Sequence, residues 1–358
     1  MPFKERVRFS SVSIVNAAAA FSLSLLISGI IIWFSGGSPL KAFIALAEGS
    51  FGSRENIILT LQKSVPLIFT GLSIGIAFKG GLFNIGSEGQ LYAGAMTAAW
   101  IGCLLPDIPG AIKLPFILLV SAAVGGLWGL MPGILKAKKN IHEVLTTILM
   151  NYIAIHLTSA LVKGPLRGDP ALIKTVPLPE SSRLPVLAGS GALILSWGLP
   201  LAVLTACLLW IFLRKTTAGF KLRAVGAGKD AAAAAGFNVK KIIITTMLLG
   251  GATSGLGGAI EVTGLHYTFY GQFSPGYGFD GIAVALLANN NPLGIIITAI
   301  LFGALRAADR TLQLNAGVPH QMVLIIQGLA ILFIGIGYLR AKRRKAKSKK
   351  NENVPVIS

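Results

Sequence analysis

Amide and carboxyl side chains interrupt a strongly apolar part of the sequence at "AFKGGLFNIGSEGQLYAGA", residues 77–95. Asn84, Glu88 and Gln90 lie there, close to the aromatic Phe83 and among several glycines. The three polar side chains supply hydrogen-bonding groups, and glycine lets the chain break and approach its neighbours closely. This stretch therefore offers hydrogen bonding to a polar group rather than covalent chemistry.

Two other places could contribute to the same chemistry. Asn151 lies in the middle of the apolar run 142–162, where a polar side chain usually faces the interior of a helix bundle. Packing hydrogen bonds and contact with a solute are both open for it. Asp280 follows "HYTFYGQFSPGYG" (266–278), which contains Tyr270 and Phe273. Such aromatic residues are typical of a membrane interface, and they could also stack on a flat base.

Other kinds of chemistry find little support. The four histidines are not clustered with acids at metal-ligand spacing, and the two cysteines lie in apolar runs. "GAGKD" (226–230) resembles the end of a phosphate-binding loop, but that loop needs Gly where Arg223 stands and Ser or Thr where Asp230 stands. We therefore expect no metal, no cofactor and no catalytic residue on this chain.

The elements that must position these residues are membrane helices. The chain has 53% hydrophobic and only 13% charged residues, whereas a soluble domain has about 25% charged residues. An all-α polytopic membrane protein with about ten transmembrane helices follows, and the eighth run is short enough to leave its full crossing open. The apolar runs are 12–34, 64–79, 87–105, 114–135, 142–162, 195–213, 241–262, 279–289, 293–307 and 319–338.

The basic residues orient these helices. With the N-terminus inside, 22 of the 32 Lys and Arg residues fall on inside segments, which favours N-in and C-in. This segregation explains the net charge of +19 better than nucleic-acid binding does. The polybasic tail, 339–358, is expected in the cytoplasm, where it could touch anionic membrane lipid.

The longest inside segment, 214–241, reads "RKTTAGFKLRAVGAGKDAAAAAGFNVKK". Asp230 is predicted to cap a short helix that Ala231 and the following alanines form, and Gly236 stands where a helix-ending glycine belongs. Phe237 follows as an aromatic beside this basic helix. We favour a docking surface for a cytoplasmic partner over a solvated connector. The predicted contact residues are Arg223, Gly226, Asp230, Ala231, Ala234, Gly236 and Phe237.

Three stretches together carry a family resemblance: residues 77–95, "IHEVLTTILMNYIA" (141–154) and "GFKLRAVGAGKDAAAAAGFNV" (219–239). They resemble the permease subunits of bacterial ABC importers for branched-chain amino acids, simple sugars and nucleosides, with the greatest similarity to nucleoside permeases of the guanosine type. The resemblance covers about residues 12–338. It implies a permease domain over 1–338 with a fold like the cobalamin importer, in the bacterial cytoplasmic membrane.

That resemblance also implies two inverted repeats, about 64–162 and 241–338, and a set of partners. A separate cytoplasmic ABC ATPase would hydrolyse ATP and grip segment 214–241. A second permease subunit, expected to be a different chain, would complete the path, and an extracytoplasmic binding lipoprotein would deliver the substrate. The chain itself would be no enzyme.

"FNIGSEGQLYAGA" (83–95) and "FSPGYGFDGIAVA" (273–285) echo each other faintly, as repeats would. Interrupted helices in transporters tend to line the substrate path. Glu88 could instead cap the helix that it begins, since an acid suits that end of the dipole. The predicted path residues are Phe83, Asn84, Glu88, Gln90, Asn151, Tyr270, Phe273 and Asp280.

Alternative functions are weighed against a nucleoside permease. An ABC permease for simple sugars or branched-chain amino acids would show the same class motifs. An ion-coupled secondary transporter needs an acid deep in a helix, but the acids here lie near the predicted helix ends and the basic inside segment would have no role. Dependence of uptake on ATP or on an ion gradient separates these mechanisms.

The orientation is tested by cysteine labelling in a variant without Cys103 and Cys207. Because residues 138 and 230 are predicted inside, cysteines there should resist membrane-impermeant thiol reagents added outside, while a cysteine at 175 should react. Labelling of residue 230 from outside would contradict the orientation.

Overall fold

The structure is a computed structural model that describes residues 11–34, 36–106, 108–191, 193–319 and isolated positions between 321 and 332. More than half of the predicted span 319–338, and the whole tail 339–358, lie outside the described residues. The chain forms two compact units, one of Met1–Ala47 with Asp309–Ser358 and one of Glu48–Ala308.

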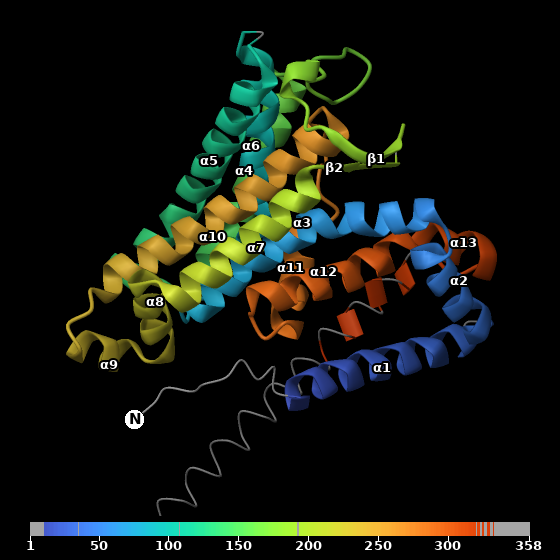
Figure 1. Ribbon diagram of the computed structural model, residues 1–358, viewed down its shortest axis with the longest axis horizontal. Helices are drawn as coiled ribbons and strands as arrows, with labels where there is room; N and C mark the ends of the chain where they lie inside the picture. Colours follow the sequence, from blue (N-terminus) through green and yellow to red (C-terminus); the bar gives the residue numbers. More distant parts are fainter. Residues whose placement is uncertain are drawn as a thin grey trace, which may run out of the picture. The chain divides into compact units, whose positions relative to one another are not determined.

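Helices make up most of the described chain, as predicted (Figure 1). The elements up to the middle of the chain are α1 (Ser11–Phe34), α2 (Pro39–Phe51), α3 (Arg54–Lys79), α4 (Ser87–Leu104), α5 (Gly110–Lys139) and α6 (Glu143–Lys163). A 3₁₀ turn (Glu180–Ser182) precedes the antiparallel hairpin of β1 (Val186–Ser190) and β2 (Leu193–Ser196). The remaining helices are α7 (Gly198–Lys215), α8 (Thr217–Ala227), α9 (Lys229–Ala234), α10 (Val239–Glu261) with a π-helical turn (Val262–His266), α11 (Tyr277–Leu287), α12 (Pro292–Ala307) and α13 (Asp309–Ala316).

Six stretches of the described chain are long and apolar enough to cross a membrane: Arg54–Lys79, Gly110–Lys139, Glu143–Lys163, Gly198–Lys215, Val239–His266 and Pro292–Ala316. The chain is therefore a polytopic all-α membrane protein. Each of the nine predicted runs before residue 319 overlaps a helix.

The largest boundary error concerns α3, which begins ten residues before the predicted 64. Ser53 caps it, because its Oγ accepts a hydrogen bond from the backbone N–H of Asn56 at 3.1 Å. Charged residues in the first turns of α3 lower the local hydropathy, so hydropathy alone did not reveal this start.

The labelling position predicted outside, Thr175, is buried. The exposed Leu172 is therefore the better position for the outside cysteine.

Close glycine contacts join a first half of the larger unit, α3 to α6, to a second half, α10 to α12. A Cβ on Gly255 of α10 would lie 2.8 Å from the Cα of Gly125 of α5, so only glycine allows these backbones to approach. A Cβ on Gly303 of α12 would lie 2.7 Å from the carbonyl oxygen of Thr60 of α3. The first long helix of each half therefore packs tightly against a helix of the other half.

Two helices begin inside this bundle rather than at its ends. After α3 the chain turns at Gly81, whose φ is +71°, and residues 82–84 run without helix. α4 then begins at Ser87, whose Oγ lies 3.0 Å from the Oγ of Ser254 in the middle of α10. In the other half α11 begins at Tyr277 after Gly276, whose φ is +94°.

α8 and α9 lie at one end of α10 and α7, and the β hairpin lies at the other end (Figure 1). The segment between α6 and α7 thus carries the 3₁₀ turn and the β hairpin, at the end opposite to the basic segment 214–241.

Candidate functional site

Asn84 and Gln90 form a reciprocal amide pair. The Nδ2 of Asn84 donates to the Oε1 of Gln90 at 2.9 Å, and the Nε2 of Gln90 donates to the Oδ1 of Asn84 at 3.1 Å. The same Oδ1 accepts from the backbone N–H of Gly86, and Nδ2 reaches the Oγ of Ser73 at 3.2 Å. Both side chains are 1% exposed, so their polar groups are satisfied within the protein.

Asn151, in the middle of α6, forms hydrogen bonds with the same break between α3 and α4. Its Oδ1 accepts from the backbone N–H of Gly89 at 2.7 Å, and its Nδ2 donates to the carbonyl oxygen of Ile85 at 2.8 Å. Of the two roles left open for Asn151, the packing hydrogen bonds are present. The neighbouring Tyr152 points away and is 58% exposed.

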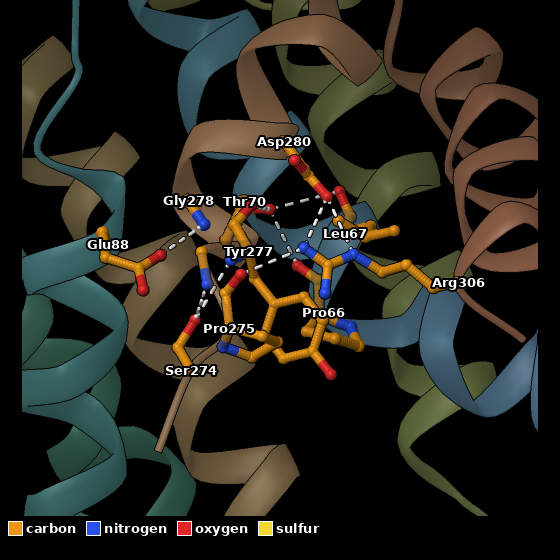
Figure 2. A network of polar contacts seen from close by, with 11 residues as sticks. Pro66, Leu67, Thr70, Glu88, Ser274, Pro275, Tyr277, Gly278, Asp280 and Arg306 are labelled. Carbon is orange, nitrogen blue, oxygen red and sulfur yellow. Dashed lines mark hydrogen bonds and ion pairs between the residues drawn. The ribbon is translucent and has the colours of Figure 1, made fainter. Parts of the chain in front are cut away.

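Glu88 joins the two helices that begin inside the bundle (Figure 2). Its Oε2 accepts a hydrogen bond from the backbone N–H of Gly278, in the first turn of α11, at 2.5 Å. A Cβ on Gly278 would lie 2.3 Å from the backbone nitrogen of Glu88, so the two helix starts touch. Glu88 thus serves the N-terminus of the opposite helix rather than capping its own, and a carboxylate suits both helix dipoles.

Asp280, also in the first turn of α11, forms an ion pair with Arg306 (Figure 2). The guanidinium Nη2 lies 2.7 Å from the Oδ2 of Asp280 and also donates to the carbonyl oxygen of Pro275 at 3.2 Å. Arg306 covers the Tyr277 ring at 4.9 Å, and the Oγ1 of Thr70 donates to the Tyr277 carbonyl. Residue spacing could not reveal this pair, because the partners lie 26 residues apart.

The aromatic candidates are packed against one another to different extents. Phe273 is 1% exposed and stacks on Phe269 with ring centres 5.0 Å apart. Tyr270 is half-buried, and its hydroxyl lies 3.4 Å from the Nε2 of His266. Phe83 is 53% exposed and sits edge-on to Phe78. The predicted contact of these residues with a solute stays a prediction, as it does for the buried amides.

The basic segment folds as two short helices, α8 and α9, where one was predicted. Gly228 separates them with extended backbone and is the N-cap of α9, so the prediction that Asp230 caps this helix is wrong. Asp230 instead lies in the first helical turn, where its charge still suits the helix dipole.

The predicted end of the short helix is confirmed in detail. Gly236 has a φ of +79°, its N–H donates to the carbonyl of Ala233, and the N–H of Phe237 donates to the carbonyl of Ala232. These are the two hydrogen bonds of a Schellman motif. The Phe237 ring is half-buried and meets the exposed Phe220 edge-on, with ring centres 6.3 Å apart.

Gly226 brings this segment against the break between α3 and α4. A Cβ on Gly226 would lie 2.1 Å from the carbonyl oxygen of Lys79 and 2.9 Å from the backbone nitrogen of Gly81. Gly226 is thus needed for backbone contact within the chain, whereas Arg223, Asp230, Ala231 and Ala234 are exposed. The described residues contain no cluster of three or more potential metal ligands.

Comparison with known proteins decides the family. The family described as the permease component of branched-chain amino acid transport systems matches residues 56–335. The chain belongs to this permease family. Together with its six membrane-length stretches, this makes the permease a multi-pass protein of the cell membrane.

Three relatives cover most of the permease. It is 40% identical to the guanosine ABC transporter permease protein NupP of Bacillus subtilis (strain 168), over 89% of this chain and 92% of that protein. It is 32% identical to the nucleoside ABC transporter permease protein NupB of Lactococcus lactis subsp. cremoris (strain MG1363), over 89% and 90%. It is 33% identical to the glucose ABC transporter permease protein TsgB13 of Haloferax volcanii, over 87% and 84%. No solved structure matches the chain.

The amide pair can be tested through stability. Asn84→Leu and Gln90→Leu should each lower the free energy of unfolding by about 1–3 kcal/mol, because each leaves a buried polar partner unsatisfied. The double variant should lose clearly less than the sum, since its second change removes a group that has already lost its partner. Denaturant unfolding of the purified permease in detergent measures all three. Leu at the exposed Asn315 is the control, with little expected effect. Additive losses would contradict the pairing.

Proposed function

We propose that the permease is the membrane subunit of an ATP-driven importer and forms the translocation path for nucleosides. The observation that carries this proposal is 40% identity to a guanosine ABC transporter permease along nearly the whole of both chains. The second nucleoside permease among the relatives supports the same substrate class. A simple sugar is the second candidate, because a glucose permease is 33% identical.

The finer architecture belongs to the same proposal. Ten transmembrane helices, both termini in the cytoplasm and two inverted repeats would give the fold of the cobalamin importer. The reciprocal packing of α5 on α10 and of α3 on α12 supports such repeats. So does the shared pattern of Phe, two residues and then the Gly that precedes α4 and α11, at 83–86 and 273–276.

The partners follow from this function. A separate ABC ATPase binds and hydrolyses ATP, a binding lipoprotein delivers the substrate, and a second, different permease chain completes the path. The permease itself holds no cofactor and catalyses no reaction. The ATPase docks on α8, α9 and Phe237, whose charged and small residues are exposed at one end of the bundle.

A coupling route to the membrane interior starts at this docking surface. α8 touches the turn at Gly81 through Gly226, and the following residues lead to α4. Glu88 in the first turn of α4 holds the first turn of α11. A displacement of α8 on ATP binding would therefore reach both helices that begin inside the bundle.

The docking surface is tested by Phe237→Ala. The ring is already half-buried, so the part that the ATPase would cover contributes about 0.8–1.5 kcal/mol, and its loss should weaken ATPase binding by roughly fourfold to tenfold. Binding of the purified ATPase to the permease complex in nanodiscs measures this effect. Phe116→Ala, which removes a phenylalanine ring that is 48% exposed on α5, away from α8 and α9, is the control. Unchanged binding of the Phe237 variant would show that the segment is only a connector.

The substrate is tested by uptake in vesicles that contain the complete complex. Labelled guanosine should accumulate only when ATP is present on the side of the membrane that carries the ATPase. Collapse of ion gradients by ionophores should not stop this uptake. Excess adenosine should compete, whereas glucose, ribose and leucine should not. Uptake of glucose without inhibition by guanosine would favour the sugar candidate, and dependence on an ion gradient would contradict an ATP-driven importer.

A further inference from the structure

The predicted path residues raise a problem, because the buried amides face the protein interior. The amide side chains of Asn84, Gln90 and Asn151 are each 1% exposed. Their polar atoms form hydrogen bonds within the protein at the break before α4. A solute that passes the permease also needs polar side chains that are exposed in the single chain.

Among the described residues, two polar side chains meet this condition in the middle of the six membrane-length stretches. Among the described residues that lie at least seven positions from both ends of a stretch, Tyr152 and His156 are exposed and polar, and all other exposed side chains are apolar. Neither of the two has a hydrogen-bond partner within the described part of the chain.

Tyr152 and His156 lie on one face of α6. They are four residues apart, so their side chains are neighbours on the helix surface. Leu145 and Leu149 continue the same exposed stripe toward the start of the helix, with exposures of 58% and 53%. The opposite face is buried and carries the polar residues Thr147, Asn151 and Thr158.

A tyrosine hydroxyl and an imidazole in the central turns of a membrane helix are costly against lipid. Polar groups at that depth face a bundle interior or a water-filled path. The face of α6 that contacts the bundle interior is the opposite one. The Tyr152–His156 face therefore lies against lipid or against water, and its two polar groups favour water or a polar solute.

We propose that the Tyr152–His156 face of α6 is a wall of the translocation path and that these two residues contact the base of the nucleoside. A phenol ring can stack on the flat face of a base. A neutral imidazole offers one donor and one acceptor for the polar edge of the base. The assignment rests on the proposed function, because it takes a nucleoside as the solute.

Accessibility is the first test. In a transport-competent variant without Cys103 and Cys207, single cysteines at 152 and 156 should react with a membrane-impermeant methanethiosulfonate in the assembled complex. Excess guanosine should slow both reactions. A cysteine at Leu208 is the matched control: it lies at a similar place in α7, is 55% exposed and has an apolar surround, so it should stay unreactive. Reactivity at 152 and 156 no greater than at 208 would overturn the proposal.

Selectivity is the second test, and it separates solute contact from assembly. Tyr152→Phe keeps the ring and should retain guanosine uptake, while Tyr152→Leu should reduce it about tenfold at an equal amount of assembled complex, the loss expected for one ring–base stack. His156→Leu should change the ratio of guanosine to cytidine uptake. Normal uptake and an unchanged ratio in both leucine variants would refute contact with the base.

The two proposals fail in different ways. If the unmodified complex carries glucose but no nucleoside, the substrate assignment fails, and protection of the 152 and 156 cysteines by glucose would still identify α6 as the wall. If the complex carries guanosine while both cysteines stay unreactive, the function holds and the role of α6 is wrong.

Discussion

A helix that begins inside a membrane bundle leaves backbone groups that lipid cannot satisfy, and the structure depends on how the protein satisfies them. The described part of the permease has two such helices, α4 among α3 to α6 and α11 among α10 to α12. Asn84 and Asn151 bind the backbone at the first break, and Glu88 binds the backbone at the second. One hydrogen bond from Gly278 to Glu88 therefore links the interruptions of both halves.

Glycine makes this arrangement possible in two different ways. At Gly81 and Gly276 it allows a left-handed backbone that turns the chain back into the bundle. At Gly226, Gly255 and Gly303 it removes a side chain where two backbones touch. The same residue type thus makes the breaks possible and also packs the helices around them.

The sequence predicted the existence of the helices much better than the direction of their side chains. Long apolar runs located nine helices because lipid demands such runs, and the Gly236 signal located the end of α9. Asn151 and Tyr152 are adjacent in an apolar run that gives no reference face, so hydropathy could not tell that one points inward and the other outward. The pairing of Asp280 with Arg306 and the contact of Gly226 with Gly81 depend on tertiary structure and have no local signal.

During synthesis, the contacts between the two halves determine the order in which pairs of helices can pack. α3 has extensive contacts with α12, and α5 with α10, so neither pair can form until the ribosome has completed the second half. The amide pair of Asn84 and Gln90 has both partners in the first half and can close early. Until the second half is complete, the surfaces of α3 and α5 that will contact α12 and α10 lack those partners. A nascent permease that stalls after α6 would present these surfaces to other membrane proteins, and quality-control proteases could distinguish it from the finished chain on that basis.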